Sequence, residues 1–99
     1  MRLSLDVANA IQTAFLQVFE KGDLYLFGSR VDDNRKGGDI DLYVNADNRE
    51  HLGEKRVAFL AQIKHYIGDQ RIDLVIARGT QRSIDIIATS EGILLCQHH

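Results

Sequence analysis

Hydrophobic residues recur with a helical period in two long stretches of the chain. The first stretch covers residues 5–19, and its apolar residues lie three or four positions apart: Val7, Ile11, Phe15 and Val18. The second covers residues 47–68, with Asp47 or Asn48 as a candidate N-terminal cap. One stripe runs along it, made of Leu52, Arg56, Phe59, Leu60, Ile63 and Ile67. The pattern predicts two amphipathic helices here and a shorter third helix around residues 82–89.

Other segments alternate with the two-residue period of a β-strand. In residues 39–44, DIDLYV, every second side chain is apolar: Ile40, Leu42 and Val44. The intervening side chains share the opposite face: Asp39, Asp41 and Tyr43. Residues 71–77, RIDLVIA, repeat this alternation and place Asp73 on the face of the strand that is opposite to the face of Leu74. The short apolar segments 23–27 and 93–96 predict a further strand and an edge strand.

These elements predict one α/β (α+β) domain that spans residues 1–99. The 44% hydrophobic content is that of a folded globular protein, and no repeat or interdomain linker interrupts the chain. We expect the strands at 39–44 and 71–76 to be neighbours in one sheet. The helices then pack on one face of that sheet, against its apolar side chains.

Charge and cysteine content narrow the classes of partner and the location. The net charge is -2, and the basic and acidic residues are interspersed without a basic stripe, so we expect no direct nucleic-acid binding. A single cysteine, Cys96, excludes an internal disulfide framework. The first residues lack the continuous apolar stretch of a signal peptide or membrane span. The sequence therefore predicts a cytoplasmic protein with no membrane association.

Three aspartates carry the candidate chemistry. If the two alternating strands are neighbours, then Asp39, Asp41 and Asp73 stand on the same face and repel one another. A divalent cation neutralises such a cluster, and carboxylate oxygens suit Mg²⁺ or Mn²⁺. Two such ions can clamp the attacking and leaving oxygens of a phosphoryl displacement. The pattern thus predicts a metal site for phosphate chemistry.

The segment after residues 23–27 supplies groups for binding the phosphates. Gly28 allows close approach of backbone amides, and Ser29 adds a hydroxyl donor. Arg30 is the first candidate for a positive contact to a triphosphate, and Arg35 and Lys36 in the same loop are further candidates.

Together these motifs resemble the minimal nucleotidyltransferases of the polymerase-beta superfamily. The resemblance rests on Gly28-Ser29, then Asp39-Ile40-Asp41-Leu42, then the later strand aspartate Asp73, and it covers nearly the whole chain. There is one departure, since many members have a glycine four residues after the serine, where this sequence has Asp33.

The resemblance implies a small mixed sheet flanked by helices, two Mg²⁺ ions, and ATP as nucleotide donor. It implies that Asp39, Asp41 and Asp73 ligate the metals, and that Asp73 also activates the acceptor. Gly28 and Ser29 would bind phosphates. Members of the family often act as antitoxins beside a HEPN-domain toxin, and the best understood ones transfer AMP to a tyrosine of that toxin. We therefore expect an AMP-transferring enzyme with a HEPN-domain partner.

Two other functions remain open. The domain could be a non-catalytic module that neutralises a HEPN toxin by binding, or a small-molecule nucleotidyltransferase. Because so short a chain cannot enclose a nucleotide alone, a partner or a second copy in a homo-oligomer should complete the site. Asp85 is interpreted as part of a solvated helix face or as a cap, and Tyr43 as a cross-strand packing residue.

Overall fold

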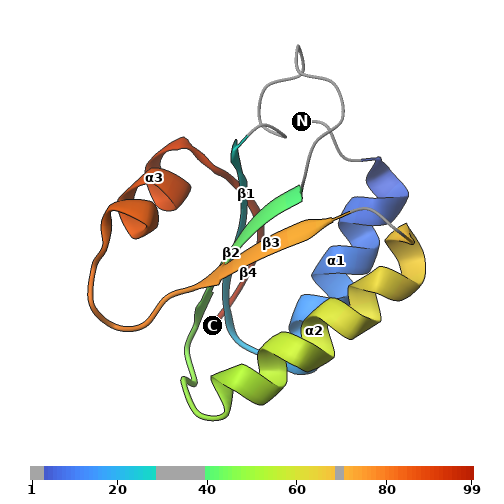
Figure 1. Ribbon diagram of the computed structural model, residues 1–99, viewed down its shortest axis with the longest axis horizontal. Helices are drawn as coiled ribbons and strands as arrows, with labels where there is room; N and C mark the ends of the chain where they lie inside the picture. The colour runs from blue at the N-terminus through green and yellow to red at the C-terminus, as the bar shows by residue number, and fades with distance from the viewer. Residues whose placement is uncertain (1–3, 29–39, 69–70) are drawn as a thin grey trace.

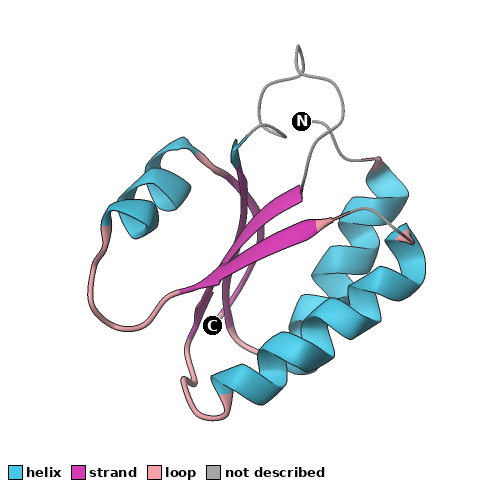
Figure 2. Cartoon of the chain, viewed as in Figure 1, coloured by secondary structure: helices cyan, strands magenta, loops and turns pink. Residues whose placement is uncertain are grey.

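The computed structural model describes residues 4–28, 40–68 and 71–99, which form three helices and four strands (Figures 1 and 2). In chain order the elements are α1 (Leu5–Val18), β1 (Gly22–Phe27), β2 (Ile40–Ala46), α2 (Leu52–Ile67), β3 (Ile72–Ile76), α3 (Ser83–Glu91) and β4 (Ile93–His98). Every helix and strand that the hydrophobic pattern predicted is present. Within these ranges, no helix has the length and apolar character needed to cross a bilayer.

The four strands form one mixed sheet in the order β3-β2-β1-β4. Strand β1 pairs antiparallel with β2 and with β4, whereas β2 and β3 run parallel. The predicted adjacency of the two aspartate-bearing strands is confirmed, and so is the edge position of the last strand. The parallel pair is possible because α2 connects β2 to β3 as a crossover helix.

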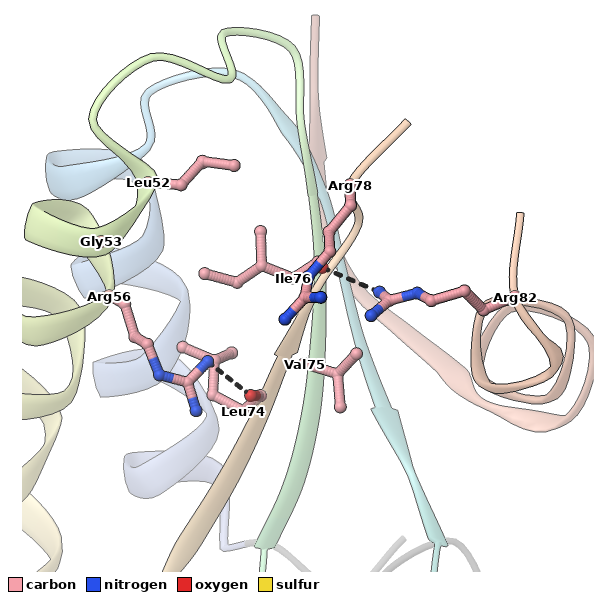
Figure 3. A pocket seen from close by; sticks show the side chains of 8 residues that line it. All are labelled: Leu52, Gly53, Arg56, Leu74, Val75, Ile76, Arg78 and Arg82. Atoms are coloured by element: carbon pink, nitrogen blue, oxygen red, sulfur yellow. Dashed lines mark hydrogen bonds between the residues drawn. The ribbon is translucent and has the colours of Figure 1, made fainter. Parts of the chain in front are cut away.

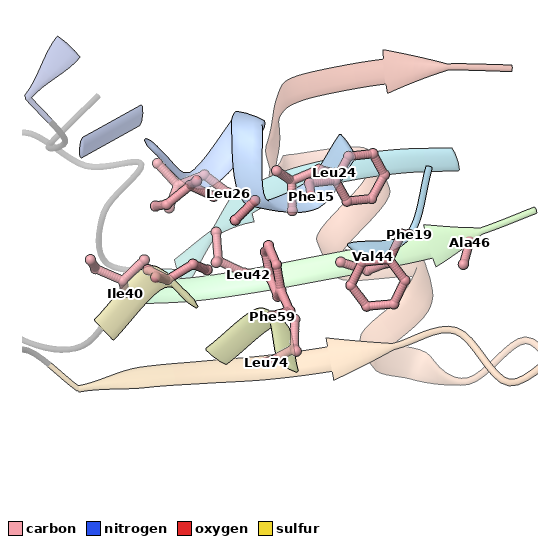
Figure 4. Close-up of a cluster of buried hydrophobic side chains, with 13 residues drawn as sticks. Phe15, Phe19, Leu24, Leu26, Ile40, Leu42, Val44, Ala46, Phe59 and Leu74 are labelled. Carbon is pink, nitrogen blue, oxygen red and sulfur yellow. The ribbon is translucent and has the colours of Figure 1, made fainter. Parts of the chain in front are cut away.

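The main core lies between the sheet and the pair α1 and α2 (Figure 4). The apolar set of β2 predicted from alternation, Ile40, Leu42 and Val44, is fully buried there. Aromatic rings from both helices meet above it, since Phe19 contacts Phe15 and Phe59 with ring centroids 5.7 and 5.4 Å apart. The apolar faces of the helices and of the strands, which the sequence periods predicted, therefore bury the same cluster from two sides.

The third helix departs from the prediction that the helices pack on one face. Figure 1 shows α3 on the side of the sheet opposite α1 and α2. It contributes Ala88 and Ile84 to a second apolar cluster with Phe27 and Tyr43. The second face carries enough aromatic surface to bury a short helix, so the aspartate-bearing face is partly covered.

The start of α2 also differs from the prediction that Asp47 or Asn48 caps it. The helix begins at Leu52, after His51 in a left-handed conformation with φ 57°, and no side chain caps it. The Oδ1 of Asn48 instead accepts a hydrogen bond from the N–H of Glu50, 2.9 Å away. Asparagine stabilises a turn by this local bond as readily as it caps a helix, so the polar run 47–50 forms a turn.

Candidate active site

Two of the three predicted aspartates lie directly opposite each other. Asp41 on β2 and Asp73 on β3 are partners in the parallel register, so both side chains emerge on the same face of the sheet. Both residues are half-buried, and the Asp73 side chain keeps 44% of its surface exposed. Asp39 lies outside the described residues. The structure thus brings together the two carboxylates that it describes, on neighbouring strands and on one face of the sheet.

Gly28 packs against one of these carboxylates. It follows the last residue of β1, Phe27, which is the register partner of Asp41. Its φ is +74°, and a Cβ added to it would stand 2.2 Å from the Oδ2 of Asp41. Only glycine fits a backbone that is both left-handed and this close to a carboxylate. Ser29 and Arg30, like Arg35 and Lys36, lie outside the described residues.

A positive side chain stands beside the second carboxylate. The Nε of Arg71 lies 3.6 Å from the Oδ1 of Asp73, and the arginine side chain is 74% exposed. An ion pair this exposed contributes little to stability, because solvent screens it. Such a pair leaves the Asp73 carboxylate accessible for other interactions.

The geometry fits a divalent cation. Among the described residues there is no group of three or more His, Cys, Asp or Glu side chains that could hold a metal ion. The pair Asp41 and Asp73 nonetheless offers hard oxygen ligands on neighbouring strands, which is the donor set that Mg²⁺ uses together with substrate phosphates. Any larger residue at position 28 would collide with the Asp41 carboxylate.

A buried polar network near this face was missed by sequence reasoning. The hydroxyl of Tyr43 donates to the Oδ1 of Asp85 at 2.6 Å, and the tyrosine and the aspartate are only 3% and 6% exposed. The Oδ2 of Asp85 accepts from the backbone N–H and the Nε of Arg82, at 2.6 and 3.0 Å. Asp85 is therefore a cap, as one reading had it, but a buried one and not part of a solvated face. The sequence carries no standard signal for this cap, since a capping box has Ser or Thr at the N-cap, where this helix has Arg82.

These contacts shift the acidity of both groups. The hydrogen bonds from Arg82 and then from Tyr43 hold the pKa of Asp85 well below its usual range. Burial, reinforced by the hydrogen bond to Asp85, raises the pKa of Tyr43 far above that of a free phenol. The pair stays as carboxylate and neutral phenol at neutral pH, which is what a structural tether of α3 to β2 requires.

A small mixed sheet that carries paired carboxylates beside a glycine turn is typical of enzymes that transfer phosphoryl or nucleotidyl groups with a divalent cation. The sequence matches the model of the family described as Polymerase beta, Nucleotidyltransferase over residues 9–99. The chain belongs to this nucleotidyltransferase family, which implies a nucleotide donor and a divalent metal in general terms. The comparison with curated proteins gave no match.

Solved structures of toxin–antitoxin complexes share the fold. One is the tri-AMPylated Shewanella oneidensis HEPN toxin in complex with MNT antitoxin, with a TM-score of 0.67 and 22% sequence identity over 92% of this chain and 70% of the matched chain. Another is a mutant of the toxin–antitoxin MntA–HpeT, with a TM-score of 0.71 and 22% identity over 91% of this chain and 72% of the matched chain. At this level of identity the likeness establishes the fold.

Proposed function

We propose that the protein is a metal-dependent nucleotidyltransferase that transfers AMP from ATP to a tyrosine hydroxyl of a HEPN-domain partner, and so acts as an antitoxin in the cytoplasm. The observation that carries the proposal is the register of Asp41 with Asp73, with Gly28 packed against Asp41. Membership of the nucleotidyltransferase family supports the reaction class. The partner is supported by the structural neighbours, of which one contains an AMPylated HEPN toxin.

In this proposal Asp39, Asp41 and Asp73 hold two Mg²⁺ ions, or Mn²⁺, and the bound cations stabilise negative charge that develops on the transferred phosphate. The backbone at Gly28, the Ser29 hydroxyl and the Arg30 guanidinium bind the donor phosphates. A carboxylate oxygen of Asp73 accepts the proton of the acceptor hydroxyl. The acceptor oxygen bonds to the α-phosphorus, and the bond from the α-phosphorus to the bridging oxygen breaks, which releases pyrophosphate.

The test is Asp73→Asn, assayed by the intact mass of the HEPN-domain protein after incubation with ATP and Mg²⁺. Asparagine keeps the size of the side chain but removes its charge and its capacity to take a proton. We expect the variant to bind ATP with Mg²⁺ and to fail to add AMP, because the group acts mainly in the transition state. Asp6→Asn is the matched control, since Asp6 is exposed in the first turn of α1 and far in sequence from the site.

Four outcomes separate the competing functions. AMP addition by the wild type and the Asp6 variant alone supports the proposal. Equal addition by the Asp73 variant would show that Asp73 has been misassigned. If the wild type adds nothing but still neutralises the toxin, the protein is a binding module, and if it modifies only small hydroxyl compounds, it is a small-molecule transferase. Light scattering of the same samples measures whether the protein also forms homo-oligomers.

A further inference from the structure

A cleft of about 400 Å³ runs along the outer edge of β3, between α2 and α3 (Figure 3). Three of the side chains that line it are arginines and none is acidic, although the whole chain has 14 acidic and 12 basic residues. The lining residues are Leu52, Gly53, Arg56, Leu74, Val75, Ile76, Arg78 and Arg82. Positive charge is thus concentrated at one edge of a protein whose net charge is -2.

Hydrogen bonds to β2 fix which backbone groups of β3 face this cleft. The carbonyl of Arg71 accepts from Ile40 on β2, and the N–H of Ala77 donates to Val44. Odd-numbered residues of β3 therefore turn their backbone groups toward β2. Because backbone groups alternate in direction along a strand, the N–H and C=O groups of Leu74 and Ile76 point outward into the cleft.

Two arginines already occupy the outward carbonyls. The Nη1 of Arg56, from α2, donates to the Leu74 oxygen at 2.7 Å. The Nη2 of Arg82, at the start of α3, donates to the Ile76 oxygen at 3.0 Å. Guanidinium groups have no acceptor, so they cannot pair with the outward N–H groups beside them. An added β-strand would have to displace both arginines. An anion could instead accept hydrogen bonds from the outward backbone N–H groups and from the guanidinium groups at the same time.

The third arginine completes the positive lining. Arg78 is exposed, and its side chain extends back along β3 toward Ile76 (Figure 3). Arg82 also pairs with Asp85, which offsets part of its charge. Arg56 and Arg78 therefore supply most of the positive potential in the cleft.

We propose that this cleft binds an acidic segment of a protein partner, through Asp or Glu carboxylates. Carboxylates match guanidinium and backbone N–H donors in charge and geometry. A short acidic segment is favoured over nucleic acid, because three arginines in one cleft can contact a few carboxylates, whereas a long phosphate backbone would extend past them over a chain whose net charge is -2. Along β3 the cleft begins at Leu74, the residue after the candidate catalytic Asp73. That this partner is also the acceptor of the nucleotide rests on the proposed function, whereas the binding of an acidic segment does not.

The test uses the whole protein and a fluorescein-labelled poly-glutamate peptide, with anisotropy as the readout in low-salt buffer and without nucleotide. Arg78→Gln should weaken binding about fivefold or more, because it removes a charge-assisted contact from an exposed position that the fold does not need. Lys64→Gln is the matched control, with the same loss of charge on an exposed residue near the end of α2. In ¹⁵N-labelled protein, the backbone N–H signals of Leu74 and Ile76 should shift when the peptide is added.

Equal weakening in both variants would overturn the proposal, because it would indicate attraction to net charge alone. Shifts confined to other residues would also overturn it. Tighter binding of a short oligothymidylate than of the peptide would assign the cleft to nucleic acid instead. Since no nucleotide is present, a failure here leaves AMP transfer unaffected, and a failure of AMP transfer leaves this binding result intact.

Discussion

Replacing Tyr43 by Phe should destabilise the fold measurably, although it removes a single oxygen atom. The hydroxyl donates a 2.6 Å hydrogen bond to Asp85, and both side chains are buried. A hydrogen bond to a charged group contributes about 1.5–3 kcal/mol. Asp85 keeps its bonds from Arg82, so we expect a loss near the middle of this range, about 2 kcal/mol in the free energy of unfolding. For a domain of this size that loss lowers the Tm by about 10 °C.

The assay is urea unfolding followed by circular dichroism, with Tyr25→Phe as the matched control. Tyr25 is half-buried on the same face of the sheet, and its ring contacts that of Tyr43 at 6.1 Å between centroids. Removing its hydroxyl should change the free energy of unfolding by less than about 0.5 kcal/mol. A Tyr43→Phe loss no larger than that of the control would refute the view that the network tethers α3 to the sheet.

The pH dependence of this difference gives an independent check. The folded-state pKa of Asp85 is lowered, so its contribution is present above its unfolded pKa of about 4 and is lost as the pH falls below that value. The pKa of Tyr43 is raised, so its contribution is present below its unfolded pKa of about 10 and is lost as the pH rises further. Wild type and Tyr43→Phe should therefore differ most between about pH 4 and pH 10, and a constant difference would contradict the assignment.

Two further perturbations follow from contacts of single residues. Gly28→Ala should lower the Tm and weaken binding of ATP with Mg²⁺, because the added Cβ meets a carboxylate at 2.2 Å on a backbone with positive φ; Gly53→Ala, which meets nothing within 4 Å, should do neither. The carboxylates of Asp47 and then Asp23 raise the pKa of His99, so this contact stabilises the fold below the unfolded pKa of about 6.5 and is lost as the pH rises through the folded value. His99→Gln should remove this stabilisation. Chemical denaturation should therefore show a larger difference in stability between the two proteins below the transition than above it, and an equal difference at both pH values would show that the contact is absent.

Local patterns predicted much of the sheet and of the candidate site. Alternation along residues 39–44 and 71–77 placed Asp41 and Asp73 on one face, because the side-chain period of a strand leaves no other arrangement. It could not predict that α3 covers part of that face. This packing depends on the contact of Tyr43 with Asp85, which lie 42 residues apart, and no local period encodes a contact of that kind.

The two carboxylates that define the candidate site were easier to predict than the groups around them. An aspartate in an apolar strand conflicts with strand propensity, so it stands out in the sequence. Arginines that bind backbone carbonyls do not stand out in this way. Arg56 lies within the apolar stripe of a helix and Arg82 precedes one, and only the three-dimensional placement of β3 as an edge strand shows their common target.

The pairing of β1 with β4 has a consequence for the order in which the fold assembles during synthesis. Gly22 and Leu24 are the register partners of His98 and Cys96, so this interior strand needs a segment that is translated well after it. Until β4 arrives, that side of β1 is an open edge with unsatisfied backbone groups. Contacts so distant along the chain slow folding and prolong the time in which a nascent chain can pair with the wrong strand. The growing protein is therefore most exposed to misassembly in the interval between the synthesis of β1 and that of β4.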